Sequence, residues 1–494
     1  MCAILENRMQ EQTTEFESLK QKTAKGVAAL TSRTFILQVV ALVATFVLTV
    51  LLDPATFGIF YIVTAIVNFL NYFSDIGLAA ALIQSHADPC DADYSTTFTL
   101  QQLLVITAVS VAFLLSGPIG NLYGFGSSGV FLFRALCLSF FLSSLKTIPS
   151  VMLERKLDFN RLVIPQVVET SLFYLTAIVL AYMGYGVLSF AWAAIIRGVS
   201  GTALLYMLAP WKPAFHINRA SAKRLLSFGL PFQANSFMAL IKDDLLTAFL
   251  GTILPFAAIG YIGWAKKWAE IALRLLMDNV IKVTFPAFAR LQYSKELLSK
   301  AVNRSLEFLA ILSLPIAIGM MVTIGPFIDV IPRYEKWEPA LFSFYLFTIS
   351  SILAALSSPL VNALNALGKV RYTFFLMLFW TVITWMFVPL SVNYFGFNGV
   401  AIAAVLIGLT SFLPIVLLRK HIDLNLVKLV KPLFFSFIMA LVLLVLKTLI
   451  TSSVTELVIL VISGIVVYSG LLYVFMKKDL APYVALVTKS VFKI

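Results

Sequence analysis

Apolar residues fill this chain in runs of about 20 positions, separated by short polar connections. An α-helix needs about 20 apolar residues to cross the ~30 Å hydrocarbon core of a bilayer. The pattern therefore predicts an all-α polytopic membrane protein with about 14 transmembrane helices. The predicted spans are residues 28–52, 57–83, 97–118, 128–151, 162–183, 186–209, 230–252, 256–285, 304–328, 339–363, 373–391, 399–418, 433–450 and 457–476.

The composition supports this class. Of the 494 residues, 60% are hydrophobic and 12% are charged, and the mean hydropathy is +0.94. Soluble domains are about 25% charged, so a soluble fold is excluded. The spans use almost the whole length, and we expect one membrane domain without a soluble catalytic module.

The net charge of +13 is distributed in a way that indicates topology. Cations gather in alternate connections, and such connections of membrane proteins stay cytoplasmic. The rule predicts cytoplasmic termini in a cell (inner or plasma) membrane, and it explains the basic charge without a nucleic-acid partner. The connection 84–96 departs from this rule, because it has three aspartates and no cation. Acidic residues contribute little to the orientation of a membrane protein. The cationic connections hold Arg155, Lys156 and Arg161; Lys212, Arg219, Lys223 and Arg224; Arg290, Lys295 and Lys300; Lys369 and Arg371; Arg419, Lys420, Lys428 and Lys431.

Several residues recur at a fixed spacing, which indicates an internal repeat. Pro149, Val151, Leu157 and Arg161 are matched by Pro359, Val361, Leu367 and Arg371, each at an offset of 210. Many transporters consist of two related bundles around a central site. We therefore expect two pseudo-symmetric six-helix lobes plus two C-terminal helices. The expected parts are a polar cytoplasmic segment (1–27), the N-lobe (28–209), a basic cytoplasmic linker (210–229), the C-lobe (230–418), helices 13 and 14 (419–476) and a basic cytoplasmic tail (477–494).

The eighth predicted span carries a row of charges at a spacing of four: Lys266, Glu270, Arg274, Asp278 and Lys282. The signs alternate, so each cation has an anion one turn away. A charge at the centre of a span costs about 3 kcal/mol, and such residues normally face a bundle interior or a watery cavity. Four steps of four residues drift about 160° around a helix, so the whole row cannot face one cavity. We expect Lys282 to be an interfacial anchor and the first three residues to be the functional part.

Other ionisable residues also lie in or near spans. We expect the cations to form a cationic cavity for an anionic substrate, because arginine in particular makes bidentate contacts with phosphate. The carboxylates are candidates for ion coupling, and the alternative is that they only neutralise the cations. The expected cavity cations are Arg274, Arg197, Lys266, Lys242, Arg33 and Lys146, of which the first two lie deepest. The candidate coupling carboxylates are Glu270, Asp75, Asp244, Asp278 and Glu169.

The sequence offers no motif for catalysis. There is no Gly-Lys-Ser/Thr loop for nucleotide phosphates, and neither the 3 histidines nor the 3 cysteines have metal-ligand spacing. We therefore expect no catalytic residue, metal or cofactor. A polytopic glycan polymerase or ligase is a less favoured alternative, because such enzymes typically present large external loops and those of this chain are short.

Four segments resemble a known family. They are Leu52-Asp53-Pro54-Ala55-Thr56-Phe57-Gly58, Phe73-Ser74-Asp75-Ile76-Gly77-Leu78, Glu154-Arg155-Lys156-Leu157-Asp158-Phe159 and Tyr334-Glu335-Lys336-Trp337-Glu338-Pro339-Ala340. Together with the helix count, they resemble Wzx-type flippases, the polysaccharide exporter branch of the multidrug/oligosaccharidyl-lipid/polysaccharide (MOP) superfamily. The polar N-terminal extension is not part of that pattern.

The resemblance implies a two-lobed, alternating-access translocator for cell-surface polysaccharide biosynthesis. Its substrate would be undecaprenyl-pyrophosphate-linked oligosaccharide, moved from the cytoplasmic to the outer leaflet, with H⁺ or Na⁺ as candidate coupling ions and membrane lipid as a partner. A drug or cation antiporter of the same superfamily is the alternative. A cation exporter should present an acidic site, whereas the deep arginines favour an anionic substrate.

Overall fold

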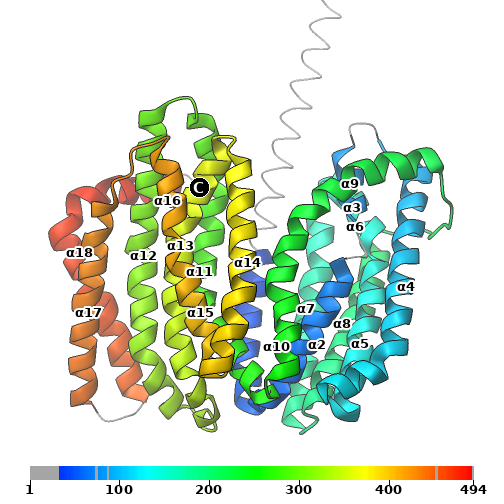
Figure 1. Cartoon of the computed structure of the whole chain (residues 1–494), viewed down its shortest axis with the longest axis horizontal. Helices are drawn as coiled ribbons and strands as arrows, with labels where there is room; N and C mark the ends of the chain where they lie inside the picture. The colour runs from blue at the N-terminus through cyan, green and yellow to red at the C-terminus, as the bar shows by residue number, and fades with distance from the viewer. Residues whose placement is uncertain (1–32, 73–75, 86–87, 451–453, 492–494) are drawn as a thin grey trace, which may run out of the picture. The chain divides into compact units, whose positions relative to one another are not determined.

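The computed structural model describes residues 33–72, 76–85, 88–450 and 454–491, which divide into two compact units, Met1–Gly260 and Tyr261–Ile494. All regular secondary structure of the described residues is helical (Figure 1). Each of the fourteen predicted spans overlaps a described helical segment. Twelve described helices are long and apolar enough to cross a membrane. The predicted all-α polytopic fold class is therefore confirmed.

The first unit is built around α8. Small buried residues such as Ala191, Ala194 and Gly198 allow this helix to pack closely against α2, α5, α6 and α7. The helices of the unit are Arg33–Leu51, α2 (Pro54–Tyr72), α3 (Leu78–Gln84), α4 (Asp91–Tyr123), α5 (Gly126–Ser144), α6 (Thr147–Arg155), α7 (Phe159–Tyr182), α8 (Val187–Leu208), α9 (Arg219–Leu240), the π-helix η1 (Ile241–Leu245) and α10 (Leu246–Ile253).

The fourth span is broken between α5 and α6. Pro149 lacks the N–H that would bond to the carbonyl of Leu145 four residues earlier. The Tyr206 hydroxyl on α8 donates to that carbonyl at 3.0 Å, and Thr202 on the same helix donates to the Leu142 carbonyl at 2.8 Å. Helix α8 therefore satisfies backbone groups at the break.

A single arginine connects the motif 154–159 with the C-terminal end of α3. The Arg155 guanidinium donates to the carbonyls of Leu82 at 2.8 Å and Ser85 at 3.0 Å, at the C-terminal end of α3. It also pairs with Asp88 at 3.0 Å. A cation here satisfies carbonyls that a helix end leaves open.

The second unit is held together by α12, which packs against α13, α17 and α18. Its helices are α11 (Phe256–Leu291, whose first turn belongs to the first unit), α12 (Lys295–Val330), the 3₁₀-helix η2 (Glu335–Ala340), α13 (Leu341–Ala366), α14 (Val370–Phe395), α15 (Asn398–Leu409), α16 (Phe412–Arg419), the 3₁₀-helix η3 (Leu426–Leu429), α17 (Val430–Leu449) and α18 (Val454–Val491).

An aromatic cluster fixes α11 against η2. The Trp264 ring is buried and stacks on Trp337 with ring centroids 5.5 Å apart. Its Nε1 donates to the Tyr334 hydroxyl at 3.0 Å. This packing explains the aromatic residues of the motif 334–340.

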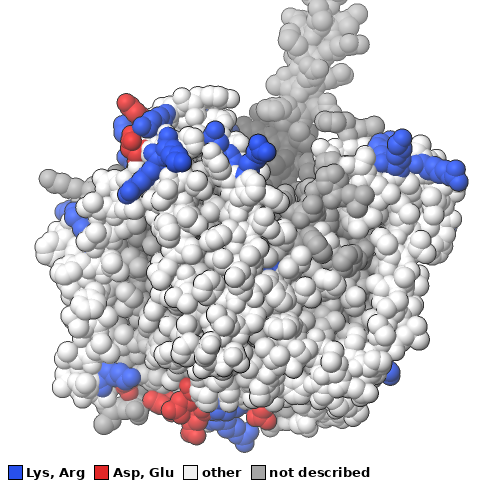
Figure 2. Space-filling model, in the orientation of Figure 1, with Lys and Arg blue, Asp and Glu red and all other residues white. Residues whose placement is uncertain are grey.

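The charged side chains follow the membrane pattern. On the face seen in Figure 2, Lys, Arg, Asp and Glu lie mainly at the helix ends of each unit, and the band between the ends is almost free of them. Charges are excluded from surfaces that face hydrocarbon. The distribution is that of a multi-pass membrane protein.

Several helices extend beyond the predicted spans. Helix α12 begins at Lys295 rather than near 304. Helix α18 has non-helical backbone at Met476 and then continues to Val491, through the segment that was predicted to be a tail. An apolar run marks only the hydrocarbon-crossing part of a helix, and Lys and Glu extend it because they are good helix formers.

The two compact units differ from the predicted lobes. The predicted boundary was the linker 210–229, whereas the contacts divide the chain after Gly260. The reason is that α9 and α10 pack against α2, α3 and α4. The functional division into two lobes stays a prediction.

Candidate functional site

Helix α8 places Arg197 in the middle of a membrane span. The residue lies ten positions after Val187, where the helix begins, and eleven before Leu208, where it ends. Its side chain is exposed, and its guanidinium carbon lies 5.9 Å from the centroid of the Phe173 ring on α7. Among the described residues, no carboxylate forms an ion pair with it. An exposed cation with an aromatic neighbour and no counter-charge is available to an anion.

A second charged feature of the first unit is the ion pair of Lys146 and Glu169. The Lys146 ammonium lies 2.5 Å from Glu169 Oε2, and the two side chains are only 16% and 8% exposed. Lys146 belongs to the break between α5 and α6, and Glu169 belongs to α7. The pair packs on the backbone of α8, because a Cβ on Gly201 would lie 1.7 Å from Glu169 Oε2. The structure therefore brings together a predicted cavity cation and a predicted coupling carboxylate.

Helix α11 carries the predicted charged row. Arg274 and Glu270 form an ion pair of 2.7 Å, with Arg274 67% exposed and Glu270 23% exposed, and Lys266 one turn earlier is half-buried. At 100° per residue, Lys266 and Glu270 lie on the side of the helix away from Trp264 and Trp268, and Arg274 lies about 80° from Trp264. The aromatic cluster thus fixes which face of α11 bears the charges.

The seventh span contains the π-helix η1, which interrupts α-helical geometry at residues 241–245. It includes the half-buried Lys242 and also Asp244, whose Oδ1 accepts a hydrogen bond of 3.1 Å from Asn68 Nδ2 on α2. Turns of π-helix often occur at functional sites. The predicted residue Asp244 therefore ties η1, which also carries Lys242, to α2.

The remaining predicted residues are less defined. Arg33 is half-buried at the first described position and lies within electrostatic range of Glu154. Asp75 lies outside the described residues, and the side chains of Asp278 and Lys282 lie outside the described side chains. In the part of the chain that is described, no three metal-ligating side chains come together.

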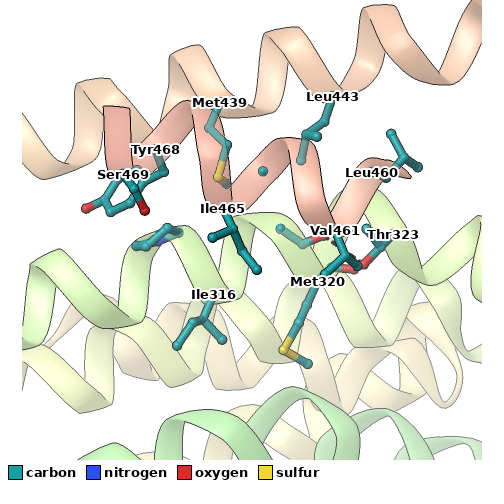
Figure 3. A pocket seen from close by; sticks show the side chains of 13 residues that line it. Ile316, Met320, Thr323, Met439, Leu443, Leu460, Val461, Ile465, Tyr468 and Ser469 are labelled. Carbon is teal, nitrogen blue, oxygen red and sulfur yellow. Dashed lines mark hydrogen bonds between the residues drawn. The ribbon is translucent and has the colours of Figure 1, made fainter. Parts of the chain in front are cut away.

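The apolar groove of the second unit was missed by sequence reasoning. It is a cavity of about 310 Å³ between α12, α17 and α18, hereafter the α12–α17–α18 groove (Figure 3). Gly319 and Gly464 leave room for it, since a Cβ on either would meet only ordinary contacts of 3.5 Å or more. Its walls include Ile316 and Met320 from α12, Met439 and Leu443 from α17, and Leu460 and Ile465 from α18. In the sequence, the two glycines in the middle of apolar spans were the only sign of this groove.

A buried carboxylate of α12 was also missed. Glu307 is 5% exposed, and its Oε2 lies 3.6 Å from the Lys428 ammonium of η3. In the sequence, Lys428 was interpreted only as one of the cations that mark its connection as cytoplasmic. Its partner lies 121 residues earlier, so no local spacing reveals the pair.

The sequence matches a known protein family over more than half its length. Residues 47–341 match the family described as "Polysaccharide biosynthesis protein". The lipopolysaccharide biosynthesis protein WzxC of Escherichia coli (strain K12) is 26% identical over 384 residues, which cover 75% of each chain. The teichuronic acid biosynthesis protein TuaB of Bacillus subtilis (strain 168) is 25% identical over 62% of this chain and 63% of its own length. The succinoglycan biosynthesis transport protein ExoT of Rhizobium meliloti (strain 1021) is 22% identical over 56% of each chain. The chain thus spans three quarters of the first relative and under two thirds of the other two.

The fold is also found in solved structures. A lipid II flippase MurJ in an inward closed conformation has a TM-score of 0.72, with 16% identity over 91% of this chain and 99% of its own. An inward-facing multidrug resistance MATE family transporter of the MOP superfamily has a TM-score of 0.60, with 15% identity over 80% and 98%. These likenesses establish the fold. The chain therefore belongs to the polysaccharide biosynthesis protein family, which confirms the resemblance to the Wzx-type branch, and it has the architecture of a MOP-superfamily translocator.

Proposed function

We propose that this protein is a flippase that moves polyprenyl-pyrophosphate-linked oligosaccharide from the cytoplasmic to the outer leaflet by alternating access. Its relatives are named for lipopolysaccharide, teichuronic acid and succinoglycan biosynthesis, which supports a glycan as cargo. The MurJ neighbour is named as a flippase of a lipid. A substrate of this class needs cations for its phosphates and an apolar path for its chain.

The observation that carries the proposal is Arg197. A guanidinium in the middle of a span, exposed and without a carboxylate partner among the described residues, favours an anionic ligand. A pyrophosphate presents oxygens that arginine can bind in a bidentate manner. The drug or cation antiporter alternative would require an acidic site, and the acidic residues Glu169 and Glu270 are both engaged by cations.

The α12–α17–α18 groove supports a lipid-linked substrate. Its walls are mainly aliphatic side chains and methionines, which suit a polyprenyl chain. Lipid tails are as apolar as these walls, so the chain gains no hydrophobic energy by leaving the bilayer for the groove. We assign the groove the role of orienting the chain, while the charged headgroup supplies specificity.

Substitution of Arg197 tests the proposal. Loss of one charge-assisted contact costs about 1.5–3 kcal/mol, so Arg197→Ala should lower pyrophosphate-lipid flipping in proteoliposomes roughly 10- to 100-fold. Arg371→Ala is the matched control, because Arg371 is an exposed arginine at the start of α14, in a connection predicted to be cytoplasmic. Wild-type flipping by Arg197→Ala, or an equal loss in both variants, would contradict the assignment.

A further inference from the structure

The contacts between α7 and α8 place Glu169 near the level of Arg197. Glu169 of α7 lies against Gly201 of α8, and Phe173 of α7 lies beneath the guanidinium of Arg197. From the first contact to the second, α7 advances by four residues (Glu169 to Phe173) while α8 goes back by four (Gly201 to Arg197), so the two helices run in opposite directions. Glu169 is therefore about one turn, ~6 Å along the axis, from the level of Arg197.

A carboxylate at this position is a natural partner for Arg197. Long side chains bridge one turn elsewhere in this chain, as Glu270 and Arg274 do at 2.7 Å. Opposite charges in a low-dielectric setting attract strongly. Arg197 nevertheless has no carboxylate partner among the described residues.

The reason is that a third element engages Glu169. Lys146 lies at the break between α5 and α6, and its ammonium is 2.5 Å from Glu169 Oε2. Buried ion pairs add little net stability compared with well-packed apolar residues, so stability alone does not explain this one. The offset of 210 that relates the repeated residues maps Lys146 to Leu356 and Glu169 to Phe379, so the second repeat has neither charge at these positions.

We propose that Lys146 is a positioning residue, which holds the Glu169 carboxylate away from Arg197 and so keeps Arg197 free for the pyrophosphate of the substrate. This inference rests on the proposed function. Gly201 is part of the same arrangement, because a side chain at this position would overlap the space that Glu169 occupies. In the absence of Lys146, Glu169 turns to Arg197 and competes with the phosphate.

The test measures equilibrium binding of a fluorescent polyprenyl-pyrophosphate glycan to the full chain in lipid nanodiscs, with the melting temperature recorded for each variant. Lys146→Met should weaken binding about tenfold or more. Glu169→Gln should bind within about threefold of wild type, and the double variant Lys146→Met/Glu169→Gln should recover to the same range. Lys146→Arg, which keeps the charge, should also bind normally.

A purely structural pair predicts a different pattern. Equal weakening by Lys146→Met and Glu169→Gln, or normal binding by Lys146→Met, would overturn the positioning role. If Lys146→Met does not fold, Gly201→Ala carries the test, because its Cβ displaces the carboxylate. It should weaken binding, and Gly201→Ala/Glu169→Gln should restore it; normal binding by Gly201→Ala would overturn the proposal.

Arg197→Ala in the same assay separates the two hypotheses. If it loses binding while Lys146→Met does not, the positioning role fails and the proposed function stands. If Arg197→Ala itself binds normally, the anion site of the proposed function fails.

Discussion

Arg197 and Arg274 are both arginines within membrane helices, but their neighbours give them different properties. Arg197 lies over an aromatic ring, and no described carboxylate pairs with it. Arg274 pairs with Glu270 on the next turn of the same helix and is 67% exposed. A pair at this spacing on one helix contributes only about 0.3–0.5 kcal/mol to stability. Arg274 is therefore available for an anion once Glu270 releases it.

Substitution of Arg274 separates function from folding. Arg274→Ala should abolish flipping of a fluorescent pyrophosphate lipid in proteoliposomes and leave the melting temperature almost unchanged, because a pair within one helix adds so little stability. Arg371→Ala is the control, since it removes an exposed arginine at the start of α14 and should preserve flipping. Normal flipping by Arg274→Ala would remove this residue from the substrate path.

Ion pairs within one helix were predictable from the sequence, and pairs between helices were not. The spacing of four alone predicts that Glu270 meets Arg274. Lys146 and Glu169 lie on different elements, so their contact depends on the turn between α6 and α7 and on the space left by Gly201. These tertiary details have no local signature, although both residues were singled out from the sequence as charges in or near spans.

At the scale of elements, apolar runs predict helices well but say little about their faces. A helix surrounded by lipid or by other helices is apolar all round, so the hydrophobic pattern does not distinguish its buried side. The α12–α17–α18 groove was missed for this reason. In the sequence, the break at Pro149 was likewise visible only as a proline within a span. The structure shows that the carbonyl freed at the break accepts a hydrogen bond from Tyr206 on another helix.

Filling the groove tests its role in orienting the lipid chain. Gly464→Leu should slow flipping several-fold, because a leucine side chain occupies part of a cavity of about 310 Å³. The fold should tolerate it, since the nearest side-chain atom to an added Cβ is 3.5 Å away. Gly470→Leu on the same helix is the matched control, as its Cβ would meet nothing within 4 Å. If both variants flip at the wild-type rate, the groove has no part in transport.

At the scale of the whole molecule, the family and the fold agree with the charge distribution. The chain is a multi-pass membrane protein with the architecture of MOP-superfamily translocators. The direction in which it is inserted rests on the positive-inside rule, which predicts that the connections rich in Lys and Arg are cytoplasmic. The proposed flipping toward the outer leaflet depends on that orientation.

Cysteine labelling tests the orientation. After the native cysteines are replaced by serine, Glu335→Cys should react with a membrane-impermeant maleimide in intact cells. With a cytoplasmic N-terminus, the ninth predicted span (304–328) ends outside the cell, and η2 follows that span. Lys212→Cys should react only after permeabilisation. Both positions are exposed, so accessibility to the reagent is matched. The reverse labelling pattern would show that the predicted topology is inverted.

The most direct test of the central claim is a reconstituted flipping assay with two lipid-linked glycans that differ only in the diphosphate. Proteoliposomes of the wild-type chain should move the fluorescent polyprenyl-pyrophosphate glycan across the bilayer, and they should move a neutral polyprenyl glycan at the rate of protein-free liposomes. Arg197→Ala should reduce the first rate roughly 10- to 100-fold. Equal transport of both lipids by the wild-type protein, or wild-type transport by Arg197→Ala, would contradict recognition of the pyrophosphate by this arginine.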